Sequence, residues 1–470
     1  MADIIIRNGF VLTMDRRRPV FPDGAIAIEG GKILAVGETS EILRNQTADI
    51  VIDARGKIVM PGMLNGHDHF EQSFMKGVVR VYPETTPTWV KEFKIPITRE
   101  MNPDDYYLSS MVSCLEMIHS GITAGVNSIC QQDMGKVKKF GLEYASKAVA
   151  ESGVKAIMAV SPADRFEPSD YLLSVDEAVR LVEWAISTWD KKFGERLRIW
   201  GGVGGVFSST PELWHSIKET TDRQGVGFHT HIASAMVGEV EEAYANGNLG
   251  PTVTGAHNVW LSPRDVEIMA KTGTRAVHCP TYKLSYSIDS RVDKFGDGIA
   301  PIAEMVETGV TTGLGSDGCM GDTRDMFREM RNLAFTQHYR MRDKTLFPPA
   351  RLLEMATIEC ARTMSWDQSV GSLEVGKSAD VIIVDRSKPN MVPWTNPVAS
   401  LVYLVSGSDV ETVIVSGKVL MQGGKVVTVD EEKVLARAQD AGMKLIERSG
   451  LGELVSRGYQ PWWPQSKLPS

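Results

Sequence analysis

Histidines are concentrated in short apolar runs in the middle of the chain, where side chains would normally be hydrophobic. Of the nine histidines, six lie in such strand-like runs: His67, His69, His229, His231, His257 and His278. Asp317 follows a run of the same kind, in "GLGSDG". A single histidine of this kind is usually structural, but six of them with an aspartate predict a metal site. Imidazole and carboxylate ligands together suit zinc, iron, cobalt or manganese, with zinc the usual choice.

The pair His67 and His69, in "PGMLNGHDHF", has a spacing that suits such a site. Side chains alternate between the two faces of a strand, so these two imidazoles point to the same side. Asp68 points to the opposite side, and we therefore expect that it is not a metal ligand.

A (β/α)8 barrel is the fold that would bring these runs together. Between residues 59 and 365, short apolar runs such as "GVKAIMAV" and "GVGFHTHIA" alternate with longer amphipathic segments, a pattern typical of βαβ units and a parallel sheet. About eight such strands can be counted, and no Gly-rich dinucleotide motif follows the first one, which argues against an open doubly wound sheet. In a barrel, the carboxyl ends of the strands form the active-site face, where polar residues indicate chemistry.

Both ends of the chain predict a second, smaller domain. Residues 1–58 consist of short β-branched runs separated by Gly-containing turns, and the same texture returns in residues 366–430. We expect these segments to form one composite β-sandwich domain, with the barrel of residues 59–365 inserted between its halves. Residues 431–470 begin with a helical pattern and end in an irregular, aromatic tail.

The composition excludes several classes of protein. The 470 residues are 43% hydrophobic and 23% charged, and the formal net charge is −8, so the chain lacks the basic face that nucleic acids require. Its five cysteines are scattered and form no CxxC pair, which favours a reducing compartment over a disulfide framework. We find no secretory signal and no apolar stretch of the ~20 residues that a membrane span needs. We expect a cytoplasmic protein that acts on a small molecule.

An ordered set of motifs resembles the metal-dependent amidohydrolase superfamily, and within it the branch of cyclic deaminases and triazine or phenylurea herbicide hydrolases. "KIVMPGMLNGHDHF" is similar to the first barrel strand of that family, and "GFHTHIA", "GAHNVW", "AVHCP" and "GLGSDG" follow in the family's order. "MATIECARTMSWDQSVGSLEVGKSADVIIVD" resembles the family's return into the small β domain. The resemblance spans nearly the whole chain. It implies a barrel with a β satellite, hydrolysis of a C–N bond and assembly into a homo-oligomer.

The resemblance also implies roles for individual residues. Four would be ligands of the metal: His67, His69, His231 and Asp317. His257 would bind the metal or contact its water and the substrate, and His278 would face the substrate. His229 shares a strand face with His231, but the family usually uses one histidine there, so we expect it to be structural or to support the ligands. The fourth-strand run "LRIWGGVGGVFSS" lacks the lysine that bridges two metals in binuclear relatives, which favours one metal.

These residues could carry out hydrolysis. A bound divalent metal can lower the pKa of its water from about 15.7 to about 7, which gives hydroxide at neutral pH. Asp317 could take the proton of that water and deliver it to the leaving group. His257 and His278 could polarise the oxygen or ring nitrogen of the electrophile. The expected product is a cleaved carbon–heteroatom bond, in the first place carbon–nitrogen.

One departure from the deaminase pattern bears on the substrate. Deaminases of this branch carry His-x-x-Glu on the fifth strand, and the glutamate moves protons to a ring nitrogen, whereas Ser234 stands three residues after His231 here. A serine hydroxyl cannot do that acid–base work at pH 7, and the nearest carboxylate, Glu239, lies outside the motif. Attack on an amide, urea or carbamate carbonyl needs less help. We therefore favour such a substrate, with deamination of a nitrogen heterocycle as the alternative.

The substrate pocket is expected to be apolar or aromatic, because the fourth-strand and seventh-strand motifs lack polar residues that deaminases carry there. Four residues are candidates for its lining: Trp89, Phe207, Ser234 and Tyr282. We consider Arg324 as a ligand for an acidic substrate group but do not favour it.

A rival interpretation is a catalytically silent barrel that serves as a scaffold. The missing glutamate speaks for it, but the histidines of both strands and Asp317 are present, and a scaffold tends to lose metal ligands first. We favour a mononuclear metal-dependent hydrolase that cleaves a non-peptide C–N bond of a small molecule.

Overall fold

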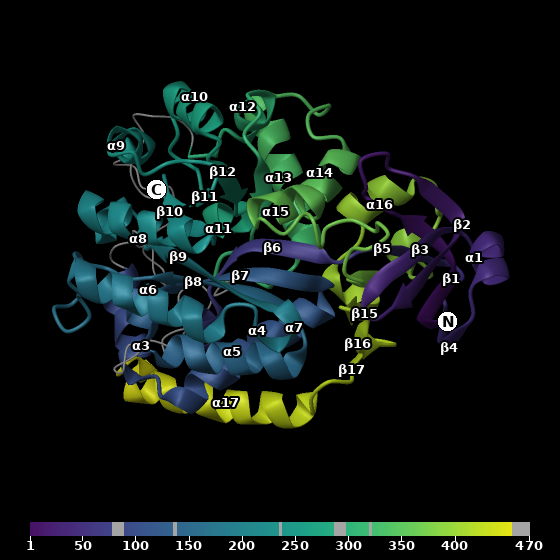
Figure 1. Cartoon of the computed structure of the whole chain (residues 1–470), viewed down its shortest axis with the longest axis horizontal. Coiled ribbons are helices and arrows are strands. Elements are labelled where there is room, and N and C mark those ends of the chain that lie inside the picture. Colours follow the sequence, from purple (N-terminus) through teal and green to yellow (C-terminus); the bar gives the residue numbers. More distant parts are fainter. Residues whose placement is uncertain (78–88, 135–138, 235–236, 286–297, 319–321, 454–470) are drawn as a thin grey trace, which may run out of the picture.

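The computed structural model describes residues 1–77, 89–134, 139–234, 237–285, 298–318 and 322–453. It contains a parallel eight-stranded barrel and a separate sheet that is built from both ends of the chain (Figure 1). The predicted fold class, a (β/α)8 barrel with a small composite β domain, is confirmed. Within the described residues, no helix is both long enough and apolar enough to cross a lipid bilayer.

The barrel strands follow one another in space in the same order as in the chain. They are β6 (Met63–Asp68), β7 (Ile122–Cys130), β8 (Lys155–Ser161), β9 (Leu197–Val203), β10 (Phe228–Ile232), β11 (Val253–His257), β12 (Arg275–His278) and β13 (Thr312–Leu314). After β13, the backbone N–H groups of Ser316 and Asp317 donate to the carbonyl oxygen of His67, 3.2 and 3.0 Å away. These bonds bring the end of the last strand against the first.

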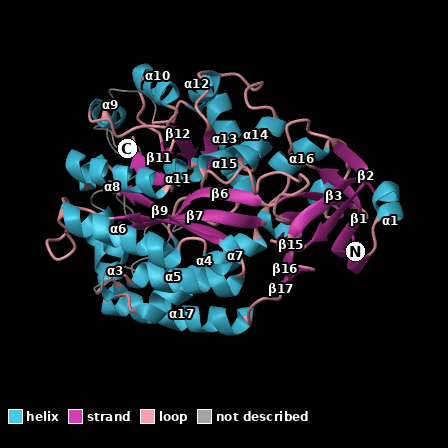
Figure 2. Ribbon diagram, viewed as in Figure 1, coloured by secondary structure: helices cyan, strands magenta, loops and turns pink. Residues whose placement is uncertain are grey.

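Buried side chains explain why these segments are strands. Every residue of β7, β8 and β11 is buried, as expected where helices cover a parallel sheet on one side and side chains fill the barrel on the other. Figure 2 shows the strands surrounded by helices. The main outer helices are α4 (Pro103–His119), α5 (Phe140–Ser152), α6 (Val175–Trp189), α8 (Pro211–Gln224), α9 (Glu239–Ala245), α10 (Pro263–Thr272), α12 (Ile302–Glu307) and α13 (Met326–Met341).

Capping residues set where several of these helices begin. Asn102 caps α4, and its side chain accepts hydrogen bonds from two backbone N–H groups of the first turn. Ser174 and Ser262 cap α6 and α10, each in a capping box with an acidic residue three positions later. These two serines end the loops that follow β8 and β11. The caps therefore fix the lengths of two loops at the mouth of the barrel.

The small β domain combines strands from the two ends of the chain. The N-terminal part supplies β1 (Ala2–Leu12), β2 (Val20–Glu29), β3 (Lys32–Glu38), β4 (Ala48–Asp53) and β5 (Lys57–Pro61), and the C-terminal part supplies β14 (Val381–Asp385), β15 (Val410–Val415), β16 (Lys418–Gln422) and β17 (Lys425–Val426). The sheet order is β17-β16-β15-β14-β5-β1-β2-β3, with β4 paired to β1. Where the halves meet, β5 runs antiparallel to β14, with Val59 opposite Ile383.

Shorter elements complete the two parts. Those after barrel strands are η1 (Phe70–Met75), η3 (Val90–Lys94), α3 (Ile95–Glu100), η4 (Gln131–Met134), η5 (Val206–Ser208) and α11 (Pro280–Ser285). The others are α1 (Thr39–Asn45), α7 (Lys192–Glu195), α14 (Pro349–Met355), α15 (Ile358–Thr363), η7 (Pro389–Met391), α16 (Pro397–Tyr403) and η8 (Gly407–Asp409). The last helix, α17 (Glu431–Arg448), lies along α4 and pairs Arg448 with Asp105 at 2.6 Å (Figure 1). The aromatic tail expected after it lies outside the described residues.

A buried ion pair joins the barrel to the small β domain. The ammonium of Lys155, at the start of β8, lies 2.5 and 2.7 Å from the two carboxylate oxygens of Asp380. We expect Asp380→Ala to lower the free energy of unfolding by about 3–5 kcal/mol, because it leaves the Lys155 charge buried without this partner. Glu183→Ala, which removes the exposed partner of Arg223, is the control and should cost at most about 1 kcal/mol. Urea denaturation measures both, and equal losses would contradict the prediction.

Candidate metal centre

The ends of four barrel strands bring the predicted metal ligands together. His67 lies in β6 and His69 directly after it, His231 lies in β10, His257 ends β11, and Asp317 follows β13. Ring nitrogens of His67, His69 and His231 lie within 4.8 Å of one another, and so do donor atoms of His67, His257 and Asp317. His67 belongs to both groups, so the five side chains converge on one place at the carboxyl end of the barrel.

The hydrogen bonds of His69 and His231 show which ring nitrogens are free to bind a metal at this site. Nδ1 of His69 lies 2.8 Å from the carbonyl oxygen of Ser128, and Nδ1 of His231 lies 2.9 Å from that of Gly204. A carbonyl only accepts, so Nδ1 donates in both rings and each neutral ring keeps a lone pair on Nε2. The two Nε2 atoms lie 3.2 Å apart. Two lone pairs at that distance repel each other unless a cation binds both, so this donor set fits a divalent metal.

Burial keeps these imidazoles neutral. Desolvation lowers the pKa of His231 to about 3 and the pKa of His69 well below its usual range, and the nearby charge of Lys94 adds to both effects. Neutral imidazole is the form that binds a metal. His67 is completely buried. Its Nδ1 makes no hydrogen bond to another described residue, and its Nε2 lies 3.4 Å from Oδ1 of Asp317. A metal ligand role would explain a buried imidazole of this kind.

Asp317 reaches the same place as an anion. Its Oδ1 lies 3.4 Å from Nε2 of His67 and 3.5 Å from Nε2 of His69. Burial by itself would raise the pKa of the Asp317 carboxyl, but the imidazoles around it, His67 foremost, hold this pKa well below its usual range. A carboxylate in this position can bind a metal and can also accept a proton from a water molecule beside it.

Four residues at the ends of these strands have left-handed backbone conformations, which residues other than glycine rarely adopt. They are Ala233 (φ 49°), His257 (φ 77°), Asn258 (φ 57°) and Asp317 (φ 60°). Each such conformation costs of order 1–3 kcal/mol and persists only where the surrounding structure holds it. Next to Asp317, a Cβ on Gly318 would overlap the amide end of the Gln72 side chain, which would have to move. The fold therefore holds the ligand set in a conformation that the local chain would not adopt by itself.

Two of the predicted histidines lie beside this ligand set. His278 ends β12, is buried, and has its Nδ1 3.0 Å from the carbonyl oxygen of His257. It is not among the described residues that line the cavity next to the ligands, and its role toward substrate stays a prediction. His229 stacks on His67 with ring centres 5.0 Å apart and belongs to neither ligand group among the described residues.

A cavity opens onto the candidate metal centre. All four residues predicted for the substrate pocket line it: Trp89, Phe207, Ser234 and Tyr282. The Tyr282 ring lies 5.0 Å from the ring of His257, and the Phe207 ring lies 5.2 Å from that of Phe166. The cavity thus places aromatic groups beside the converging ligands, as the proposed pocket requires.

The cavity wall also carries polar residues that the sequence analysis did not single out. They are Gln72, Lys94, Gln131 and Glu167. Lys94 is 2% exposed, and its Nζ lies 3.5 Å from Oε1 of Glu71. These polar residues come from loops after β6, β7 and β8, whose approach to the ligands depends on tertiary structure. The only local sequence signal for a buried polar residue here is Lys94, a charged residue within the apolar run "EFKIPI".

Ser234 lies on the cavity wall, where it offers no acid group. Glu239, the next carboxylate in the chain, does not supply one there. Glu239 is buried, and its Oε2 accepts a hydrogen bond from the backbone N–H of Ala233, 2.5 Å away. It is not among the described residues that line the cavity. Glu239 therefore holds the loop after β10 and is not placed to serve as the missing acid.

Glu239 should make the stability of the protein depend on pH. Burial raises its pKa from 4.5 to about 7. The folded protein therefore keeps a proton that the unfolded chain releases, so this contribution to stability is full below pH 4.5 and is lost as the pH rises through 7. In the wild type, the free energy of unfolding should fall by roughly 3 kcal/mol across this range because of Glu239. Glu239→Gln stays neutral and should not show this fall. Melting temperatures of both proteins between pH 5 and pH 8 test this, and parallel curves would contradict it.

Comparisons with known sequences extend over nearly the whole chain. The sequence model of the amidohydrolase family matches residues 58–420. The 5'-deoxyadenosine deaminase of Methanosarcina acetivorans is 33% identical over 463 residues, which cover 96% of this chain and 100% of that protein. The 5-methylthioadenosine/S-adenosylhomocysteine deaminase of Pelotomaculum thermopropionicum is 31% identical and covers 95% and 100% of the two chains.

Comparisons with solved structures show the same fold. The adenosine deaminase of Xanthomonas campestris with bound zinc aligns with a TM-score of 0.83 and 20% identity over 96% of this chain and 99% of that chain. The atrazine chlorohydrolase of Arthrobacter aurescens complexed with zinc aligns with a TM-score of 0.82 and 22% identity over 93% and 100%. Both agree with the barrel and its small β domain.

Proposed function

Because the chain belongs to the amidohydrolase family and is a metal-dependent hydrolase of C–N bonds other than peptide bonds, we propose that it cleaves an amide, urea or carbamate-like bond of a small molecule. One observation carries the choice of bond. On the cavity wall, Ser234 stands where deaminases place a carboxylate, and Lys94 adds a cation. Such a wall suits a carbonyl group, whose oxygen gains negative charge during attack, better than a ring nitrogen that needs a proton.

Four residues would hold one divalent metal ion: His67, His69, His231 and Asp317. Their convergence, the neutral imidazoles of His69 and His231, and the anionic carboxylate support this assignment. His257 lies in the same donor group as Asp317 and would be a further ligand or contact the substrate. We propose zinc, because nitrogen and oxygen donors suit it and both solved structures described above contain it. When bound, such an ion supplies Lewis acidity, which makes water a nucleophile near neutral pH.

Residues of the chain would carry out the remaining tasks. Asp317 accepts the proton that the attacking water loses and delivers it to the leaving nitrogen. Lys94 stabilises the negative charge on the carbonyl oxygen from the cavity wall. Trp89, Phe207 and Tyr282 pack against the organic groups of the substrate and exclude water.

Deamination of a nitrogen heterocycle is the second candidate function, and the curated relatives favour it. They are named 5'-deoxyadenosine deaminase and 5-methylthioadenosine/S-adenosylhomocysteine deaminase. In this chain Glu167 lines the cavity and could give a ring nitrogen the proton that Ser234 cannot supply. Asp317 would have the same role in both reactions.

A substrate screen distinguishes the two candidates. Zinc-loaded protein is incubated with one panel of amides, ureas and carbamates, and with a second panel of 5'-deoxyadenosine, 5-methylthioadenosine and other aminoheterocycles. We expect release of amine or acid from the first panel. Ammonia release from the second panel with a kcat/KM at least tenfold higher would overturn the first candidate in favour of the second, because tenfold corresponds to about 1.4 kcal/mol of transition-state binding.

We also propose that the protein is a cytoplasmic homo-oligomer. The scattered cysteines support the location, and an apolar patch on α13 supports the assembly, since Phe335 and Tyr339, one helical turn apart, are both exposed there. Tyr339 is 83% exposed and should lie in the contact between two copies. Tyr339→Glu should therefore shift the mass measured by sedimentation toward the monomer, and an unchanged oligomer would place the contact elsewhere.

A further inference from the structure

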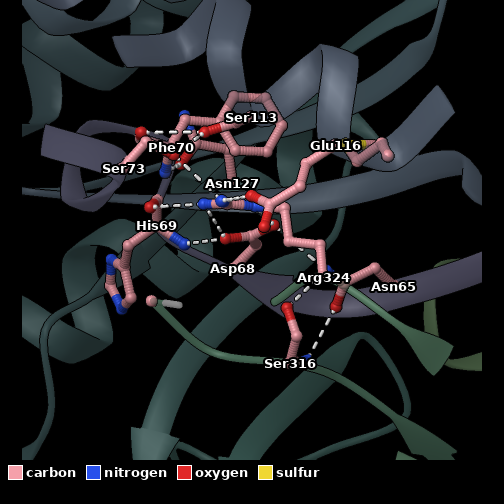
Figure 3. A network of polar contacts seen from close by, with 12 residues as sticks. Asn65, Asp68, His69, Phe70, Ser73, Ser113, Glu116, Asn127, Ser316 and Arg324 are labelled. Carbon is pink, nitrogen blue, oxygen red and sulfur yellow. Dashed lines mark hydrogen bonds and ion pairs between the residues drawn. The ribbon is translucent and has the colours of Figure 1, made fainter. Parts of the chain in front are cut away.

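Arg324 is the largest completely buried side chain in the described part of the protein. Its guanidinium makes five hydrogen bonds to other described residues, as many as it has N–H donors. Nε and Nη2 donate to the two carboxylate oxygens of Asp68 at 2.7 and 2.8 Å, and Nη2 donates to the carbonyl oxygen of His69 at 3.1 Å. Nη1 donates to Ser73 and Glu116 at 2.9 and 2.8 Å (Figure 3). These contacts leave Arg324 no access to a substrate. This agrees with the sequence analysis, which did not favour Arg324 as a ligand for an acidic substrate group.

Asp68 lies between His67 and His69 but points away from the metal centre, as strand alternation predicts. Its carboxylate accepts four hydrogen bonds. Two come from Arg324, one from the side-chain amide of Asn65 at 3.0 Å, and one from the backbone N–H of His69 at 2.7 Å. Asp68 therefore holds the stretch of backbone from which both imidazoles of β6 project.

Asn65 connects this group to the strand end that carries Asp317. Its amide nitrogen donates to Oγ of Ser316 at 2.8 Å, and its amide oxygen accepts from the backbone N–H of Ser316 at 3.0 Å. Ser316 directly precedes Asp317. A continuous set of hydrogen bonds therefore runs from Arg324 through Asp68 and Asn65 to the residue beside the carboxylate ligand (Figure 3).

The charges of this group are balanced. Glu116, on α4, accepts from Arg324 and also from Lys76 at 2.7 Å, so two cations face two carboxylates. The two-point contact of Arg324 with Asp68 depends on a planar guanidinium, which lysine cannot replace. Loss of one buried partner would leave the other charge uncompensated.

We propose that Arg324, Asp68, Asn65 and Ser316, which we call the arginine clasp, hold the β6 imidazoles and Asp317 at the spacing that a bound metal requires. The clasp rests on the metal site of the proposed function and adds positioning residues to it. None of its four residues is among the described residues that line the cavity, so it acts through the ligands and does not touch substrate. Contacts of this kind behind metal ligands typically change metal affinity by about 10–100-fold.

Arg324→Lys tests the clasp because it keeps the charge and removes the two-point contact. We expect zinc affinity, measured by competition with a chelating dye, to fall about 10–100-fold. The visible absorption bands of the cobalt-loaded variant should also shift, since the ligand geometry changes. Arg340→Lys is the matched control, because Arg340 makes a two-point contact with Glu304 at 2.9 and 2.6 Å, between α13 and α12. It should change neither measurement.

If Arg324→Lys does not fold, the double variant Asp68→Asn with Arg324→Gln takes its place, because it leaves no uncompensated charge between these two positions. Weaker zinc binding in either folded variant, at native circular dichroism, supports the clasp. Unchanged zinc affinity and an unchanged cobalt spectrum in a folded variant would overturn the clasp and leave the proposed function intact. A wild-type protein that binds no zinc at micromolar concentration would overturn the proposed function, and the clasp with it.

Discussion

Asp317→Asn should lower kcat by roughly 10³-fold or more and should leave the purified protein with little zinc. Asparagine has nearly the same shape as aspartate, but it offers no negative charge to the metal and cannot accept a proton from water. His67→Ala should also remove the zinc, because His67 belongs to both groups of converging donor atoms. Elemental analysis measures zinc per chain, and kcat is measured on the substrate that the screen identifies.

His229→Ala is the control for both variants. His229 is as buried as His67 and stacks on it, yet it belongs to neither donor group among the described residues. We expect this variant to keep about as much zinc as the wild type, although its melting temperature falls because a buried ring is removed. Zinc loss from His229→Ala with full retention in Asp317→Asn would contradict the ligand assignment.

Lys94→Met should lower kcat for a carbonyl substrate by about 10²–10³-fold while zinc content stays unchanged. Methionine fills a similar volume but brings no positive charge to the cavity wall. KM should change less than kcat, because the contact with the carbonyl oxygen strengthens mainly in the transition state. Steady-state kinetics of the variant, with zinc determined on the same preparation, provide the test.

Lys91→Met is the matched control for Lys94, since it removes an exposed lysine from the same short element, η3. It should leave kcat and KM close to the wild-type values. If the activity of Lys94→Met falls only in proportion to its zinc content, Lys94 acts on the metal centre and not on the substrate. A similar loss in both lysine variants would speak against any specific role for Lys94.

The barrel and its ligand-bearing strands could be predicted because both depend on short-range patterns. Apolar runs alternate with amphipathic segments in the chain, and a parallel barrel places the carboxyl ends of all such runs on one face. Histidines at the ends of β6, β10 and β11 were therefore expected near one another before any contact was known. The two-residue period of a strand also predicted that Asp68 faces away from His67 and His69.

The sequence predicts which face of a strand a side chain is on more readily than how far along the strand it lies from the metal centre. His229 and His231 share a face of β10, but two residues span about 6.6 Å along a strand, so only one of them reaches a given centre. His231 lies at the cavity, and His229 lies outside the donor groups. His67 and His69 both belong to a donor group, and His69 lies after the end of β6, where the chain no longer follows the regular spacing of a strand.

The polar residues on the cavity wall could not be predicted, because their placement depends on contacts between distant loops. Lys94, Gln131 and Glu167 follow three different strands, and nothing in their local sequence states which way their loops lie. Arg324 is a similar case, since its burial depends on carboxylates from β6 and α4. Sequence patterns indicate which residues prefer the interior, whereas the pairing of buried charges is decided only when the chain has folded.

The pairing of β5 with β14 has a consequence for how the chain is made. β5 is synthesised early and β14 near the end, so one edge of the N-terminal sheet has no neighbour while most of the barrel is being produced. Unpaired strand edges readily join the edges of other copies, and contacts between distant segments form slowly. A nascent chain that terminates before β14 would therefore carry an open edge directly before the strand with His67. We therefore expect chains that end before β14 to aggregate more readily than the complete chain.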